Sequence, residues 1–185
     1  MATFKIYIDV KVTDKDGKIH KHRRVRCHSF VRQMMDVMAC QMGQDTRSTK
    51  DYLAASINCT PQTTAFDVSS ISGASLFGIL LGSGQTPVDI SDYKMEGLFS
   101  NGTGGGNTLM YGACCTGKVA IVGSTATFVI DRTFVNHSGG TVDVHEIGLY
   151  NYYNSKYFLL ERTLHDISIA DGAYVNVTYT ITITV

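Results

Sequence analysis

The C-terminal stretch Tyr174–Val185 (YVNVTYTITITV) alternates between apolar and polar side chains along its whole length. Successive side chains of a β-strand point to opposite faces, so this period predicts a strand with one face buried in a core. The buried face would carry Val, Ile and Tyr179, and the other face would be a flat threonine ladder with Thr178, Thr180 and Thr182. Such a strand would be an aggregation hazard as a bare edge. We therefore expect it inside a sheet or paired with a neighbouring subunit.

A second alternating stretch, Thr3–Val12, predicts a half-buried strand near the N-terminus. Asp14–Gly17 predicts the turn of a hairpin. The return strand, Lys18–His28, has few apolar residues and would be a basic, exposed ribbon. Its candidate docking residues are Lys18, Lys21, Arg23, Arg24 and Arg26. We expect this ribbon to contact an acidic patch or a phosphate, in a way that salt weakens.

One helix is predicted after the ribbon, because apolar residues recur there at every fourth position. Ser29 is suited to cap its start and Gly43 to end it. The stripe includes Phe30, Met34 and Met38, which we count among the docking candidates. A Met-rich stripe is typical of core packing, and it also suits adaptable interfaces.

The rest of the chain predicts a β-rich body. Residues 1–43 would form an arm of hairpin and helix, 44–64 a connecting loop, and 65–185 the body. The predicted strands of the body are Ala65–Ile71, Leu76–Leu81, Tyr93–Phe99, Thr108–Cys115, Val119–Val122, Ala126–Asn136, Thr141–Tyr150 and Tyr157–Leu164. No helical pattern alternates with these strands. The sequence therefore predicts a mainly β fold, an antiparallel β-sandwich or jelly-roll-like body with an N-terminal β-hairpin and one α-helix.

Composition narrows the classes of partner. The 185 residues include 16 Lys and Arg and 16 Asp and Glu, so the overall charge predicts neither specific nucleic-acid binding nor an anionic membrane as partner. Only 17% of residues are charged, which suits a subunit covered by neighbours and equally an ordinary β-rich domain. No apolar stretch approaches the roughly 20 residues that span a bilayer. The N-terminus, Met1–Lys5, has no basic segment leading into an apolar run, so we expect no signal peptide.

No cofactor or metal is expected. The cysteines are odd in number and form no Cys-x-x-Cys, so we expect buried free thiols at Cys27, Cys40, Cys59, Cys114 and Cys115. His20 and His22 lie two apart on one strand face, but the neighbouring arginines disfavour a metal there.

No catalytic residue is predicted either. Gly112–Val119 has the spacing of a phosphate-binding loop but ends in valine where a hydroxyl must reach magnesium, so we favour a hairpin turn at Thr116-Gly117. No Gly-x-Ser-x-Gly nucleophile elbow occurs. The pairs His145-Glu146 and His165-Asp166 are separate in sequence, and strand pairing often brings such groups together.

The segment Phe128–Tyr150 resembles a module of tailed-bacteriophage structural proteins, in which a strand ending in Asn-x-Ser-Gly runs into Val-x-Glu-Ile-Gly-Leu-Tyr. Leu159–Arg162 resembles the module's Leu-x-x-Arg segment, and Val175–Val185 its closing Thr-rich strand. Upstream, Gly82–Tyr93 is similar to its Gly-x-Gly-x-x-Pro-x-x-x-x-Asp-Tyr linker. The likeness covers roughly residues 76–185 and also touches the helix start at Ser29–Arg32.

The resemblance implies a non-enzymatic virion subunit, made in the bacterial cytoplasm. It would be a capsid decoration or cement-type protein, or a neck or tail component. Its partners would be copies of itself, as a trimer or ring, and other virion proteins. A receptor- or carbohydrate-binding sandwich of a tail fibre is the alternative, and an enzyme is the third. For the alternative, the candidate aromatic residues are Tyr150, Tyr152, Tyr153 and Tyr157. Tyrosine is enriched at interfaces, so we favour an interface or a covered edge for this cluster and count Tyr150, Tyr152 and Tyr153 among the docking candidates.

Overall fold

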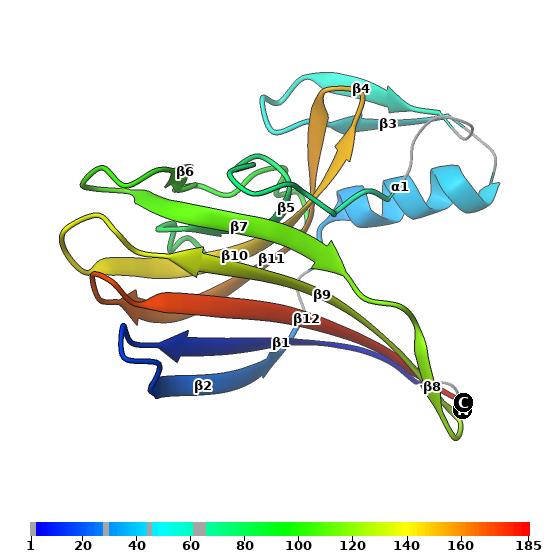
Figure 1. Cartoon of the computed structure of the whole chain (residues 1–185). Helices are drawn as coiled ribbons and strands as arrows, with labels where there is room; N and C mark the ends of the chain where they lie inside the picture. The colour runs from blue at the N-terminus through cyan, green and yellow to red at the C-terminus, as the bar shows by residue number, and fades with distance from the viewer. Residues whose placement is uncertain (1–2, 28–29, 44–45, 61–65) are drawn as a thin grey trace.

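Two β-sheets face each other in the computed structural model, which describes residues 3–27, 30–43, 46–60 and 66–185 (Figure 1). Sheet A consists of β1 (Thr3–Thr13), β2 (Ile19–Arg26), β6 (Ser100–Asn101), β7 (Thr108–Thr116), β8 (Ala120–Val122), β9 (Thr125–Val135) and β12 (Tyr174–Thr184). Sheet B consists of β5 (Gly78–Gly82), β10 (Val142–Tyr153) and β11 (Lys156–Ile169). The strand order is β2-β1-β12-β9-β7-β6 in sheet A, with β8 beside β9, and β11-β10-β5 in sheet B. The predicted mainly β sandwich is confirmed.

The closing strand lies in the middle of sheet A. β12 pairs with β1 on one side and with β9 on the other, both antiparallel, so it is not an edge. Val175, Val177 and Tyr179 are buried in the core between the sheets, as the alternation predicts. Ile183 and Val185 share that face but are 47% and 79% exposed, because at this end sheet A runs past sheet B.

The N-terminal hairpin forms as predicted. Asp14 accepts hydrogen bonds from the backbone N–H groups of Asp16 and Lys18, and Gly17 takes a φ of 82°, which favours glycine. β2 lies at the edge of sheet A, paired with β1 alone. His28 and Ser29, and with them the predicted helix cap, lie outside the described residues.

Helix α1 (Arg32–Gly43) packs on β11 and on a small hairpin, β3 (Arg47–Lys50) and β4 (Ser56–Cys59). The hairpin corrects the predicted loop over 44–64. Its turn is built by Asp51, which is buried and accepts hydrogen bonds from the backbone N–H groups of Leu53 and Ala55. Such Asx turns let a polar, aperiodic sequence form ordered structure.

Two predicted strands of the body are wrong. The described part of the first, from Phe66 to Ile71, forms only an isolated bridge between Ser70 and Cys114. Tyr93–Phe99 forms only the bridge from Leu98 to Gly82. Its backbone is held by side chains of β10 instead, as described below.

The predicted hairpin turn at Thr116-Gly117 is also wrong. β7 and β8 both pair with β9, so the chain between them is a break along one edge, and the hairpin turn comes at Gly123, before β9. Cys114 is buried and Cys115 exposed, as expected for neighbours in a strand, and the described cysteines form no disulfide. No helix among the described residues is long and apolar enough to cross a membrane.

Candidate docking surfaces and the network that supports them

A buried ion pair lies in sheet B, at the residues that carry the phage-module likeness. Arg162 of β11 donates from Nε to Glu146 of β10 over 2.7 Å, and the two residues are 1% and 0% exposed. A second bond runs from Nη1 of Arg162 to Asp92 over 3.0 Å. Burial alone would lower the pKa of Arg162, but the bonds to these two carboxylates raise it.

The same carboxylate of Glu146 holds the linker that precedes it in sequence. Its second oxygen accepts hydrogen bonds from the backbone N–H groups of Gly84 (3.1 Å) and Gly97 (2.8 Å). The Tyr150 hydroxyl accepts a third backbone bond, from Met95, over 2.7 Å. Besides a backbone bond from Ser83 to Gly97, side chains therefore fix segment 83–97 in place of a strand ladder, which explains why Tyr93–Phe99 is not a strand.

Gly84→Ala is expected to lower the free energy of unfolding by roughly 1–3 kcal/mol. A Cβ at this position would lie 2.6 Å from the bonded oxygen of Glu146 and 2.8 Å from Cβ of Glu96. Urea unfolding measures the loss. Gly104→Ala is the matched control, because no atom lies within 4 Å of its added carbon. Equal stability of the two variants would contradict the tight fit.

A second buried carboxylate, Glu161 of β11, has no cationic partner among the described residues. Oε2 of Glu161 accepts a hydrogen bond from the Tyr179 hydroxyl over 2.6 Å, and Oε1 accepts one from Thr163. Burial raises the pKa of Glu161 to about 7, against which the bonds from Thr163 and Tyr179 act. Burial also raises the pKa of the Cys27 thiol beside it.

Arg132 of β9 is fully buried, and its hydrogen-bond partners among the described residues are backbone carbonyls. It donates to Gly112, Phe77, Ile79 and Ala74, and its guanidinium lies 4.7 Å from the centre of the Tyr111 ring. Burial lowers its pKa. The residue thus ties sheet A to β5 of sheet B and to the preceding loop.

The end of sheet A that runs past sheet B is apolar on its inner face. We call this surface the apolar overhang. It consists of Phe4, Ile121, Ala126, Phe128, Ile181 and Ile183. Cross-strand register aligns these residues, since Ile183 pairs with Phe4 on β1 and with Ala126 on β9, and Ala126 pairs with Ile121 on β8. Ile121 is 75% exposed and Phe4 51%. Apolar clusters of this kind mark interaction surfaces more often than isolated exposed residues do.

The apolar overhang continues into a groove of about 470 Å³ beneath α1. Its walls are almost entirely apolar. Phe30, Met34 and Met38, predicted as docking residues, line the groove and are half-buried. Two other methionines of α1, Met35 and Met42, are exposed instead. The structure therefore brings the helix candidates together with the free end of the closing strand.

The basic ribbon candidates lie on β2, which forms one edge of sheet A, and on the turn that precedes it. Lys18, Arg23, Arg24 and Arg26 are exposed, and Lys21 is half-buried, with Nζ bonded to the backbone oxygen of Asp166. We call β2 the basic edge.

The tyrosine candidates divide into three environments. Tyr150 is 2% exposed, which corrects its prediction as an interface residue: its hydroxyl is used inside the subunit. Tyr152 and Tyr157 are half-buried, with ring centres 5.7 Å apart, and Tyr152 also packs on Phe77 at 5.0 Å. Tyr153 packs on the small cluster beneath α1. The rings of Tyr152 and Tyr157 thus pack on other rings rather than standing apart for a ligand.

The threonine candidates lie on the outer face of sheet A, at the centre of the sheet. Thr178, Thr180 and Thr182 of β12 are half-buried, between β1 and β9. Thr178 donates a hydrogen bond to Asn176. Their contact with another subunit stays a prediction.

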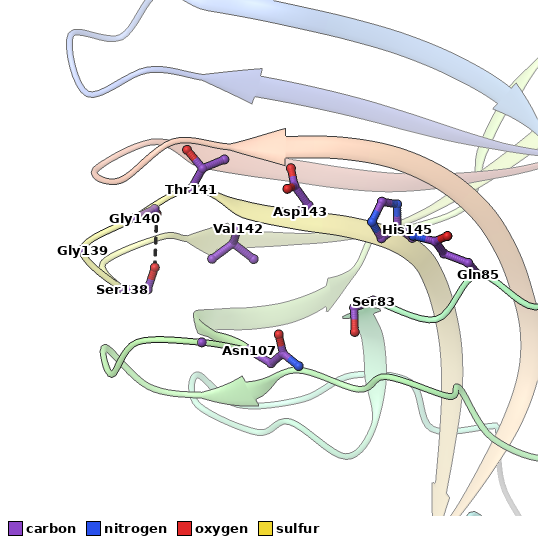
Figure 2. Close-up of a pocket in the computed structure, with 11 residues that line it drawn as sticks. Ser83, Gln85, Asn107, Ser138, Gly139, Gly140, Thr141, Val142, Asp143 and His145 are labelled. Carbon is purple, nitrogen blue, oxygen red and sulfur yellow. Dashed lines mark hydrogen bonds between the residues drawn. The ribbon is translucent and has the colours of Figure 1, made fainter.

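A polar cleft of about 630 Å³ lies beside the turn between β9 and β10 (Figure 2). At one end His145 bonds Asp166 over 2.7 Å, so strand pairing does bring the two His-acid pairs together. The hydroxyls of Ser83 and Ser138 donate to backbone carbonyls rather than to His145. The cleft thus presents no serine bonded to a base, and the described residues contain no cluster of three or more His, Cys, Asp or Glu that could hold a metal.

Comparison with known proteins gives no relative. No protein family, no curated protein and no solved structure matches this chain.

Proposed function

We propose that this chain is a non-enzymatic structural subunit of a tailed-phage virion. It would serve as a capsid decoration or cement-type protein, or as a neck or tail component. The observation that carries the proposal is the apolar overhang. The alternation of its strands predicts a core on their inner face, yet Phe4, Ile121 and Ile183 are exposed, and no layer of the described residues covers them. A solitary domain would leave this surface in water, whereas an assembled subunit would bury it.

The phage-module likeness supports the same proposal. Residues of the likeness meet in one place: Gly84 and Arg162 both donate to the carboxylate of Glu146, and Arg162 also donates to Asp92. The likeness thus falls on residues that hold segments of the fold together, which supports a structural role. These bonds fix segment 83–97 on the sandwich, and an assembly subunit needs loops of fixed conformation.

Gold-labelled antibody against the chain tests virion membership. We expect labels on intact phage particles from the cells that produce the protein. Labels over the whole head would indicate decoration, and labels at one vertex or along the tail would indicate a neck or tail component. Particles that carry no label, both intact and opened by mild denaturation, would refute the proposal.

Ile121→Asp is expected to convert an oligomer into a monomer. The charge would be buried unpaired in any contact that covers the apolar overhang, yet Ile121 is 75% exposed in the subunit, so the free energy of unfolding should change by less than about 0.5 kcal/mol. Analytical ultracentrifugation measures the mass. Thr180→Lys places a charge on the outer face of the same sheet, where contact with another subunit stays a prediction, so an intact oligomer in this variant would place the contact on the apolar overhang. If Thr180→Lys dissociates the oligomer and Ile121→Asp does not, the contact lies on the threonine face.

The tail-fibre alternative rests on the tyrosines. A glycan array probed with the purified chain separates it from the structural role, and binding of a defined glycan that Tyr152→Ala abolishes would favour it.

A further inference from the structure

We propose that the basic edge is a docking site for an acidic, extended segment of a neighbouring protein, which would add a strand to sheet A beside β2. The inference names the kind of neighbour for the assembly role proposed above and rests on it. It begins with the position of β2, whose one side pairs with β1 and whose other side has no partner strand among the described residues.

The backbone of β2 has open hydrogen-bonding groups along that free side. Cys27, just after the strand, donates its N–H to the oxygen of Ile6 over 3.0 Å. Antiparallel pairing alternates, so every second residue back along β2 bonds β1, and the residues between point their N–H and C=O groups outward. The outward residues are His22, Arg24 and Arg26, each opposite an odd-numbered residue of β1. An added strand could therefore form main-chain hydrogen bonds with these groups.

The charge of the hairpin selects an acidic strand. Residues 3–26 contain eight Lys and Arg and three Asp, a net charge of +5 in a chain whose formal net charge is 0. Arg23 lies on the inner face of β2 and Arg26 on the outer face, so cations flank the free side from both faces. Neither arginine forms an ion pair among the described residues. Carboxylates of an added strand that lie directly opposite these arginines would form stabilising opposite-charge pairs with them.

Two other roles fit the charge less well. Edge strands do use charges to prevent aggregation, but charges of mixed sign would protect the edge without the self-repulsion of a single sign. Pairing of two β2 edges from identical subunits would place like charges opposite each other, which is unfavourable.

A neighbouring histidine responds to the same positive charge. Burial and the nearby Lys21 and Arg23 lower the pKa of His165, as expected beside a field that favours anions.

Peptide binding to the purified full chain tests the proposal. The probe is an extended peptide that alternates glutamate with valine and threonine. We expect it to bind and to slow hydrogen exchange at the amides of His22, Arg24 and Arg26, which are open in the free chain. The same peptide with lysine for glutamate should not bind. An acidic peptide with proline at every second position keeps the charge but cannot form the ladder, and it should bind at least tenfold more weakly.

Variants of the chain separate the contribution of the arginine charges to peptide binding from that of backbone pairing. Arg23→Thr with Arg26→Thr should weaken the acidic peptide roughly two- to fivefold for each charge removed, whereas Lys94→Thr with Lys118→Thr, an equal charge change on exposed body positions, should have no effect. His22→Pro removes one outward N–H but none of the formal charges, and it should weaken binding about two- to tenfold.

Three results would overturn the proposal: equal binding of the proline-containing peptide, binding without amide protection on β2, or protection of the same amides by a DNA duplex but not by the peptide. The last would assign the edge to phosphate. These assays use the isolated chain, so they can fail while antibody labelling still locates the protein on virions, and they can succeed where labelling fails.

Discussion

Replacement of Arg162 by methionine is expected to lower the free energy of unfolding by about 3–5 kcal/mol, the range for breaking a buried ion pair. Glu146, which is 0% exposed, would keep its charge without the 2.7 Å bond from Nε. Urea unfolding at pH 7, followed by circular dichroism, gives the difference. An exposed change of the same chemistry, Arg23→Met, removes an arginine without an ion pair among the described residues and should alter stability by no more than about 0.5 kcal/mol.

A double variant identifies the cause of that loss. Glu146→Gln added to Arg162→Met removes the buried charge but keeps an oxygen that can accept from Gly84 and Gly97. The double variant should therefore be more stable than Arg162→Met alone, because an unpaired buried charge costs more than a neutral, hydrogen-bonded amide. If the double variant is the less stable of the two, lost packing rather than the stranded carboxylate explains the effect.

Stability should also fall with rising pH through Glu161. The carboxyl has a pKa of about 7 in the folded chain, because it is buried, against 4.5 for the exposed group. Below pH 4.5 both states hold the proton. Between pH 4.5 and about 7 only the unfolded state loses it, so the folded state loses roughly 3 kcal/mol relative to its stability in acid, and above pH 7 the loss is complete.

Glu161→Gln isolates this effect from other titrating groups. Glutamine still accepts a hydrogen bond from Tyr179 but does not titrate. The stability of the variant minus that of the wild type should therefore increase from pH 4.5 to 7 and then stay constant, as measured by urea unfolding at half-unit intervals of pH. A difference that is independent of pH would show that Glu161 titrates as an exposed carboxyl does.

The strands and the sandwich could be predicted because their signal is local. Period-two alternation in Thr3–Val12 and Tyr174–Val185 depends on one buried face, and β1 and β12 form as that pattern requires. The Asp14–Gly17 turn is equally local, since Asp14 bonds backbone groups two and four residues on. Each of these features needs no knowledge of distant parts of the chain.

Features that depend on distant partners were not predictable from pattern. Tyr93–Phe99 has the composition of a strand, but its amides at Met95 and Gly97 bond Tyr150 and Glu146, about fifty residues away in sequence. Tyr150 was misplaced on a surface for the same reason. A signal was present: Glu146 and Arg162 interrupt apolar strands, and a buried charge in such a setting needs a partner.

The residues of the apolar groove were predicted only in part. Phe30, Met34 and Met38 do share one groove, because a helix repeats every 3.6 residues. Their neighbours in that groove, Phe4 and Ile181, come from the two ends of the chain, and only the pairing of β1 with β12 places them together. Periodicity identifies which side of an element is apolar, but not what stands opposite it.

The apolar overhang has a consequence for how the chain gains its rigidity. Sheet B covers β12 of sheet A from Val175 to Tyr179, whereas Ile183 is 47% exposed and its described strand neighbours are β1 and β9. Amide groups at that end should open at a lower free energy than those in the sandwich. A subunit that covers the end would suppress this opening, and melting temperature should rise with protein concentration. Order at the end of the sheet would then be acquired during assembly rather than during folding.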